Sequence, residues 1–117
     1  MSNRLLPHAV TYYERKPDGE GFRRHLLYPV RVCEEESECD GVVIKSADLF
    51  LLRDELIMPV PEFRIGDYFI RGNYAQVLPP VEQGAYRVNH MLPKLNYNLL
   101  KLVHLQGIAA GGVSDGL

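Results

Sequence analysis

The sequence has no long apolar run, and this absence excludes membrane-spanning and secreted classes of protein. No stretch of its 117 residues approaches the ~18 consecutive apolar residues of a transmembrane helix. Residues 1–7 carry one charge and a short apolar stretch that ends at Pro7, whereas a signal peptide needs an apolar core of ~7–15 residues. We therefore expect a protein that stays in the cytoplasm in which it is made and has no membrane partner.

Cysteine is also scarce. Cys33 and Cys39 are separated by five residues, whereas zinc motifs combine closer pairs with two further ligands. A disulfide between the two is sterically conceivable, but a reducing cytoplasm disfavours it. We expect two ordinary thiols, no metal and no cofactor.

The residues and motifs of nucleophilic catalysis are missing as well. The four serines stand in terminal or loop contexts, and no G-x-S-x-G motif is present. Cys33 precedes a run of acids, which disfavours the thiolate that a catalytic cysteine needs. We expect each of the four histidines to be a strand residue half in contact with solvent; the alternative is that His90 and His104 meet across the last predicted hairpin as a weak binding pair. We expect no enzyme.

Basic residues are not in excess. The chain has 13 Lys and Arg against 15 Asp and Glu, with a net charge of −2, whereas nucleic-acid binders usually show a basic surplus. One local cationic cluster is expected where four residues face each other across the first predicted hairpin. It is either a solvated hairpin end or a patch for a polyanion or an acidic partner, and its members are Arg15, Lys16, Arg23 and Arg24.

What the sequence does have is strand alternation. Residues 8–13 are rich in β-branched and aromatic side chains and lead into a Pro-Asp-Gly turn within residues 16–21. In residues 26–32 apolar side chains recur at every second position, so the two segments predict a β-hairpin. Residues 34–40 contain five acids in seven positions and predict a solvated loop or hairpin tip.

The next segment is ambiguous between strand and helix. Residues 42–44 are β-like, and in residues 47–56 leucines recur at helical spacing after a serine that could cap a helix. The run is short and Pro59 and Pro61 follow it closely, so we favour a strand. Residues 58–63 predict an extended connector stiffened by these prolines.

The second half predicts a turn–strand–turn at residues 65–72, a loop at 73–84, and a second hairpin built from 86–91 and 100–106. Six to seven short strands with turns between them predict an all-β fold, a small antiparallel β-barrel or sandwich with long loops and flexible terminal arms. We expect one domain, residues 1–108, followed by a flexible glycine-rich tail, residues 109–117.

Several segments carry a family resemblance. Residues 5–13 have the sequence LLPHAVTYY, residues 63–72 have FRIGDYFIRG, and residues 86–90 have YRVNH. Residues 24–32 lead into the acidic segment, and residues 100–107 carry a histidine and end at a glycine. In this order the segments resemble the small head–tail connector proteins of tailed bacteriophages, of the head-closure, stopper or minor capsid type.

The resemblance implies a β-barrel that assembles as a homo-oligomeric ring in the virion neck, built in the bacterial host cytoplasm. Such a ring would join portal and adaptor proteins to the tail terminator or other tail proteins, retain packaged DNA and touch that DNA non-specifically. The alternatives are a tail-terminator or tail-completion ring, and a small ligand-binding β-barrel with a pocket around His90 and His104.

The resemblance also implies that the subunit interfaces come from loops and terminal arms. The apolar connector 58–63 and the loop 73–84 are the expected contact segments, and Phe63→Asp is expected to leave a folded protein that fails in head closure. The expected interface residues are Met58, Val60, Phe63, Tyr74, Val77 and Leu78.

Overall fold

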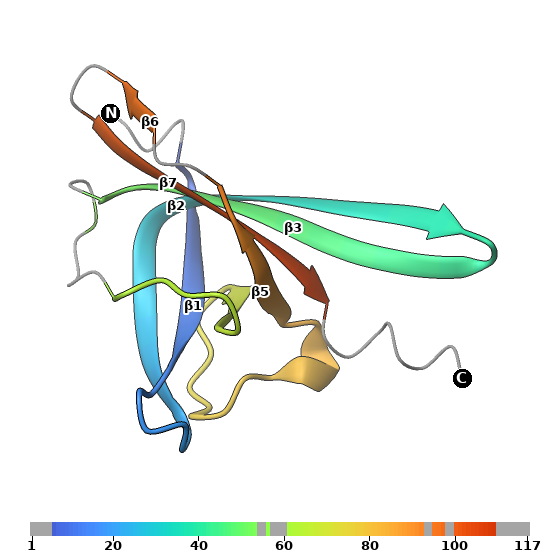
Figure 1. Cartoon of the computed structure of the whole chain (residues 1–117), viewed down its shortest axis with the longest axis horizontal. Coiled ribbons are helices and arrows are strands. Elements are labelled where there is room, and N and C mark those ends of the chain that lie inside the picture. Colours follow the sequence, from blue (N-terminus) through green and yellow to red (C-terminus); the bar gives the residue numbers. More distant parts are fainter. Residues whose placement is uncertain (1–5, 54–55, 57–60, 93–94, 98–99, 110–117) are drawn as a thin grey trace.

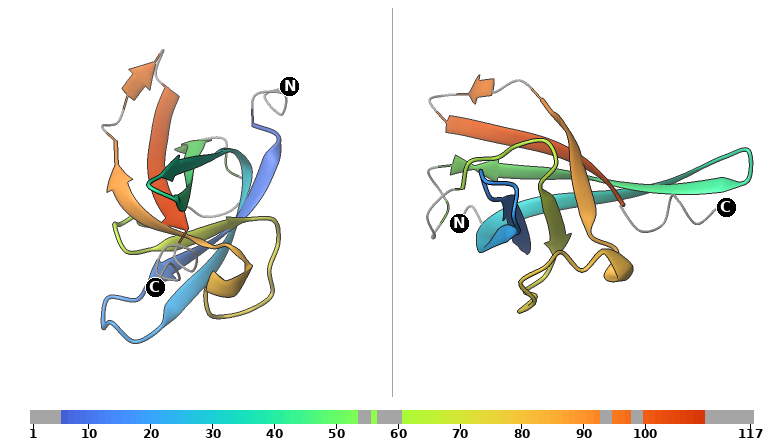
Figure 2. Two further views of the ribbon diagram at one scale, coloured as in Figure 1. Left: turned by 90° about the vertical axis from the view of Figure 1, so that its right-hand side faces the viewer. Right: turned by 60° about the horizontal axis from the view of Figure 1, so that its bottom comes forward.

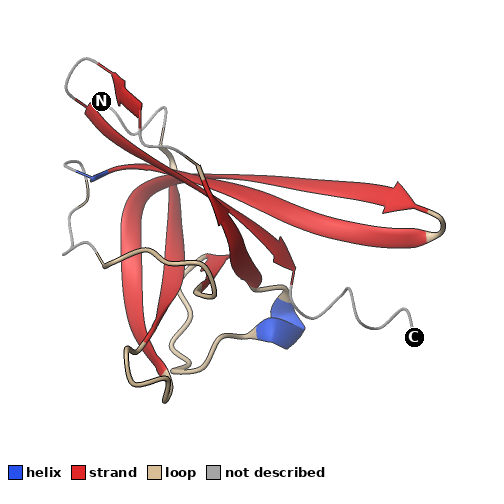
Figure 3. Ribbon diagram, viewed as in Figure 1, coloured by secondary structure: helices blue, strands red, loops and turns tan. Residues whose placement is uncertain are grey.

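The computed structural model describes residues 6–53, 56, 61–92, 95–97 and 100–109 (Figure 1). Strands dominate this part of the chain (Figure 3). The elements are β1 (His8–Arg15), β2 (Phe22–Cys39), β3 (Val42–Leu52), β4 (Tyr68–Arg71), the 3₁₀ helix η3 (Val81–Gln83), β5 (Tyr86–Met91), β6 (Leu95–Tyr97) and β7 (Leu100–Ala109).

Six of the strands close into an antiparallel barrel. Their order is β3-β2-β1-β4-β5-β7, and pairing between β3 and β7 completes the circle (Figure 2). β6 pairs with the first residues of β7, beyond the stretch of β7 that pairs with β5. The prediction of a small all-β antiparallel barrel is confirmed.

Side chains from every strand of the barrel wall fill its interior. The rings of Phe69 and Tyr86 lie 5.5 Å apart, and Phe63 packs edge-on against Tyr12 with ring centroids 5.1 Å apart. Burial of this apolar surface is the main force that holds the wall strands together. The core residues are Val10, Tyr12, Leu27, Val30, Val32, Ala47, Leu49, Leu51, Phe63, Phe69, Tyr86, Val88, Val103, Leu105 and Ala109.

A second, smaller apolar cluster involves β1, β4 and the segment that follows β4. Tyr13, Ile70 and Ala85 are buried in it. Hydrogen bonds fasten this segment to β1, because the Thr11 hydroxyl donates to the Gly72 carbonyl at 2.7 Å and the Tyr13 hydroxyl donates to the Gln76 carbonyl at 2.9 Å. The loop predicted at 73–84 is therefore anchored at its start, and it contains η3 near its end.

The first part of the ambiguous segment 47–56 is a strand, as favoured from the sequence: residues 47–52 belong to β3, Arg53 is 3₁₀-helical, and residues 54–55 lie outside the described residues. Residues 42–44 and the following residues form one strand, β3, which ends at Leu52. Its alternate residues Ala47, Leu49 and Leu51 are buried in the core. Pairing with β2 on one edge and β7 on the other outweighs the helical spacing of its leucines.

The acidic segment is a strand rather than a loop. β2 continues through it to Cys39, and its residues pair with the first half of β3 up to the pair Cys39–Val42. Asp40 and Gly41 make the turn with φ of 53° and 79°, the positive values of a two-residue hairpin loop. The loop prediction was wrong because a partner strand satisfies the backbone while the carboxylates stay in solvent; the hairpin-tip alternative was closer.

The last strand extends one residue past the expected domain boundary. Ala109 pairs with Tyr86 and is 5% exposed, so it belongs to the barrel. The remainder of the predicted tail, residues 110–117, lies outside the described residues, and so do residues 1–5 at the N-terminal end, where a flexible arm was also expected.

Gly107 in β7 is explained by close packing inside the barrel. A Cβ at this position would lie 2.9 Å from Cε2 of Phe69 and 3.0 Å from Cβ of Tyr86. Only glycine lets β7 pack this closely against the aromatic pair. This accounts for the glycine at the end of the segment 100–107 that contributes to the family resemblance.

Candidate interaction surfaces

β2 and β3 continue beyond the barrel as a two-stranded arm, which we define as residues 34–45. Figure 1 shows it projecting from one side of the barrel, and so does the right-hand view of Figure 2. Within the arm only Ile44 is half-buried, and every other residue is exposed. At its tip Val42 and Val43 are 40% and 44% exposed.

Both edges of the arm lack a neighbouring strand in the described part of the chain. β1 pairs with β2 only as far as Val30, and β7 pairs with β3 only from Ser46 onward. The backbone N–H and C=O groups that point outward from the arm therefore have no strand to bond with. Such edges are sites at which another chain adds by strand pairing or side-chain contact.

The root of the arm is fixed to the barrel through Glu34. The Tyr86 hydroxyl donates a hydrogen bond of 2.7 Å to the Glu34 carboxylate, and Nη1 of Arg71 lies 3.8 Å from it. Burial, together with this carboxylate, raises the pKa of Tyr86 well above its ordinary value. The phenol therefore stays protonated and continues to donate to Glu34.

His8 contacts β2 next to this root. The backbone N–H of Val32 donates to Nδ1 of His8 at 3.0 Å, which requires an unprotonated Nδ1. Burial lowers the pKa of His8 below 6.5, and the nearby charges of Arg71 and Arg31 lower it further. The neutral ring is thus the form that fits the folded state.

Acidification should weaken the fold through His8. The unfolded chain takes up a proton on His8 near pH 6.5, before the folded chain does, so the free energy of unfolding falls as the pH drops below that value and is restored above it. We expect urea unfolding to show a larger loss of stability between about pH 7.5 and about pH 5.5 for the wild type than for His8→Gln. An NMR titration in which His8 titrates above 6.5 would contradict this assignment.

The predicted basic cluster divides into two parts. Arg23 and Arg24 are consecutive in β2, so their side chains point to opposite faces of the sheet. Arg24 holds the start of the loop, donating to Oδ1 of Asn73 at 2.6 Å and to the carbonyl of Tyr74. Arg15, Lys16 and Arg23 remain exposed, but Arg15 is on the same face of the sheet as Arg24, whereas Arg23 is on the other face with Glu14. Their role as a patch for an acidic partner stays a prediction.

The inner face of the first hairpin carries a partly buried ion-pair group. Glu14 is 7% exposed, and its Oε1 lies 2.8 Å from Nε2 of His25 and 3.7 Å from Nη1 of Arg23. The group balances the charge of a carboxylate that would be costly to bury alone. The sequence alone did not reveal this arrangement, because it depends on the register that sets Tyr12 opposite His25.

Asp67 is the hydrogen-bonding centre beside this group. It is fully buried and accepts bonds from the Tyr12 hydroxyl at 2.7 Å, the Arg15 N–H at 2.9 Å and the Arg64 N–H at 2.9 Å. Burial and the Asp67 charge raise the pKa of Tyr12 far above its ordinary value, so this phenol remains a donor. Gly66 precedes it at φ +101°, which favours glycine. The Gly-Asp motif of the sequence therefore has a structural role. Asp67 and its three donors tie β1 to the turn before β4, and we call this hydrogen-bonded group the joint at Asp67.

His90 and His104 do not face each other, so the less favoured alternative of a binding pair is wrong. A register irregularity in β5 sets exposed His90 opposite Gln106 instead. His104 stacks on the ring of Phe50 with centroids 4.1 Å apart, and its Nε2 lies 2.8 Å from Oδ1 of Asp48. Both partners come from β3, a neighbour of β7 that the hairpin pattern alone does not predict.

The expected interface residues fall into different environments. Met58 and Val60 lie outside the described residues. Phe63 is 7% exposed and packs in the barrel core, so its assignment to an interface was wrong. Tyr74 is half-buried against the second cluster, whereas the exposed apolar residues of this loop are Val77 (71% exposed) and Leu78 (61% exposed).

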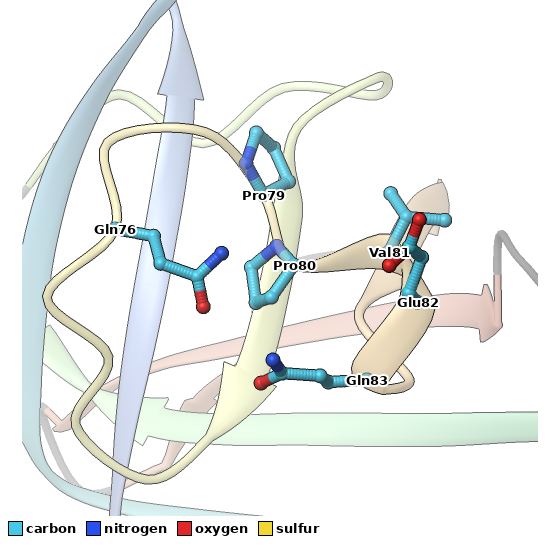
Figure 4. A pocket seen from close by; sticks show the side chains of 6 residues that line it. All are labelled: Gln76, Pro79, Pro80, Val81, Glu82 and Gln83. Carbon is cyan, nitrogen blue, oxygen red and sulfur yellow. The ribbon is translucent and has the colours of Figure 1, made fainter.

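A small hollow lies in the loop beside these two residues (Figure 4). Its volume is about 210 Å³, and its lining comes from the loop and η3 alone: Gln76, Pro79, Pro80, Val81, Glu82 and Gln83. Ligand pockets are usually of ~300–1,000 Å³ and gather polar groups from several elements. The hollow is therefore a feature of the loop surface rather than a candidate active site.

Cys33 and Cys39 are both free and exposed, as expected from the sequence. Within the described ranges, no group of three or more His, Cys, Asp or Glu side chains is placed to hold a metal ion. No helix among the residues that the structure describes has the length and apolar character needed to cross a membrane. The chain matches no protein-family model, no curated protein and no solved structure.

Proposed function

We propose that this chain is a structural subunit of the neck of a tailed bacteriophage. In this role a homo-oligomeric head-closure or head–tail connector ring joins the portal and adaptor proteins to the tail and retains packaged DNA. The order of motifs that resembles this protein class supports the proposal. The role is mechanical and involves no reaction.

The arm is the observation that carries the proposal. None of the arm residues is in the barrel core, and two-stranded ribbons are marginally stable by themselves in water. An element that adds little to folding and leaves two strand edges open is suited to contact with other subunits. A small closed barrel with such an arm is therefore suited to be one subunit of a larger assembly.

Two of the segments that carry the resemblance contact each other through Asp67. Asp67 belongs to the Gly-Asp segment, and Tyr12 and Arg15 belong to or directly follow the opening strand segment. The bonded residues are 55 and 52 positions apart in the chain and form one buried hydrogen-bonded unit. The two motifs therefore act together in the fold.

Deleting the gene from the phage that encodes it tests the proposal. We expect electron microscopy to show heads that have lost their DNA and carry no tails. Complementation with the full chain should restore infectious particles. Complementation with a chain in which an Asn-Gly turn replaces residues 36–45 should not, although that chain should keep a folded barrel by circular dichroism because the arm adds nothing to the core.

Normal particles in the deletion strain would contradict the proposal. Full heads beside tails of abnormal length would point instead to the tail-terminator alternative. Full rescue by the folded chain in which the turn replaces residues 36–45 would show that the arm is not needed for the function.

A further inference from the structure

Charge is distributed unevenly between the arm and the rest of the molecule. The arm contains five of the 15 acidic residues and one of the 13 basic residues, Lys45. The rest of the chain has ten acidic and 12 basic residues, so a net charge of −4 on the arm stands against +2 elsewhere. Glu36 faces Lys45 across the strand pair, but Glu35 and Glu38 face Ser46 and Val43, which are uncharged. The arm is therefore suited to a cationic surface.

A cationic surface lies at the opposite end of β2. Arg15 and Lys16 are exposed where β1 ends and the turn to β2 begins. Within the described residues neither Arg15 nor Lys16 has an ion pair. Asp18 and Glu20 stand in the turn beyond them, where Oδ1 of Asp18 accepts a hydrogen bond from the backbone N–H of Glu20. Arg23 is left out because it lies on the other face of the sheet from Arg15 and its Nη1 is 3.7 Å from Oε1 of buried Glu14. We call Arg15 and Lys16 the basic surface.

The like charge of two arms argues against a symmetric contact. Open strand edges alone would favour arm-to-arm pairing between two copies. Such pairing would bring two acidic ribbons together, and facing like charges cost free energy. We infer that the arm of one copy instead docks on the basic surface of a second copy of this chain; the inference rests on the proposed function in taking a second copy as the partner.

The positions of the two surfaces determine the kind of assembly. The arm is the C-terminal end of β2 with its partner strand, and the basic surface is at the N-terminal end of β2, on a different side of the barrel (Figure 1). Each copy can donate its arm to one neighbour and receive the arm of another. Repeated head-to-tail contacts of this kind close into rings when the rotation between copies permits.

A charge-swap experiment on the purified full chain tests the inference. Glu35→Lys/Glu36→Lys/Glu38→Lys reverses the arm, and Arg15→Glu/Lys16→Glu reverses the basic surface. We expect sedimentation equilibrium to show that each variant alone associates more weakly than the wild type, on the order of tenfold or more. We expect an equal mixture of the two to associate again, because every arm then meets a surface of opposite charge.

A single chain that carries all five substitutions is the matched control. It has a positive arm and a negative surface, so it should associate with itself as the mixture does. Raising the salt concentration from about 0.05 M to about 0.5 M should weaken the association of the wild type and of this chain alike. All five positions are exposed, and circular dichroism should show unchanged folds.

A wild type that remains monomeric at every soluble concentration would overturn the inference, and so would variants that associate as strongly as the wild type. A mixture that stays dissociated while each variant is folded would overturn it as well. The docking mode and the proposed function can fail independently, and the results distinguish the two failures. A chain located in the phage neck whose association ignores these charges refutes the docking mode alone, whereas charge-dependent association of a chain absent from virions refutes the neck role alone.

Discussion

Asp67→Ala should lower the free energy of unfolding by about 3–5 kcal/mol. The substitution removes three hydrogen bonds to a buried carboxylate and leaves the Tyr12 hydroxyl inside the barrel without its acceptor. Hydrogen bonds to charged groups contribute ~1.5–3 kcal/mol each, and an unsatisfied buried donor costs a further ~1–3 kcal/mol. Since domains of this size have ~5–15 kcal/mol of stability in total, much of the fold's reserve depends on this residue. Urea unfolding measures the loss.

Asp18→Ala is the matched control for this substitution. Asp18 is exposed and bonds only within its own turn, at 2.8 Å, so the change should cost less than about 1 kcal/mol. Combining Asp67→Ala with Tyr12→Phe should cost less than the two single changes together, because the stranded hydroxyl is then gone. A loss from Asp67→Ala no greater than that from Asp18→Ala would show that the joint does not hold the barrel.

Phe63→Asp should unfold the protein or lower its free energy of unfolding by about 4 kcal/mol or more. Phe63 is 7% exposed and its ring packs against Tyr12, so the change deletes a core aromatic and places a carboxylate among apolar groups. This reverses the expectation from sequence, which treated Phe63 as a contact residue whose loss would leave the fold intact. Thermal and urea unfolding of the purified variant measure the effect.

Val77→Asp makes the same kind of change at an exposed position. Val77 is 71% exposed, so the carboxylate stays in water and stability should change by less than about 0.5 kcal/mol. The pair of variants thus separates core from surface within one set of residues that the sequence grouped together. Equal effects of the two substitutions would mean that Phe63 is not in the core.

The sequence was sufficient to predict most of the strands, but not the acidic half of β2 or β6, and the reason is local. Alternation in residues 8–13 and 26–32 marks one buried face on each strand, and that face is the barrel interior: Val10, Tyr12 and Val30 are fully buried. Turn chemistry at residues 16–21 set the first hairpin. Barrel closure was predicted only as one of two alternatives, because it depends on β3 pairing with β7 across more than 50 residues.

The surfaces were harder to predict because they depend on register and on three-dimensional neighbours. A proline-rich apolar connector resembles an exposed loop in sequence, yet Phe63 at its end turns inward against Tyr12. The acidic segment resembles a loop by composition, but a facing strand of Val42, Val43 and Ile44 extends it into the arm. Asp67 stood inside a recognised motif, and only the structure shows that its carboxylate is the reason for that motif.

These features divide the described part of the chain into a barrel that holds the fold and an arm that is available for contact with other chains. Buried alternation closes the barrel, the joint at Asp67 ties β1 to the turn before β4, and the root at Glu34 holds the arm against β5 through Tyr86. The barrel is self-sufficient in its core, and the arm has two edges open to other chains. The proposed neck role and the inferred head-to-tail contact both rest on that division.

Cryo-electron microscopy of intact particles of the encoding phage tests the central proposal most directly. The account predicts a closed ring of copies of this barrel between the portal–adaptor complex and the tail, with each arm lying against the basic surface of the adjacent copy. Particles that lack the chain, or that carry it away from the neck as isolated copies, would contradict the account.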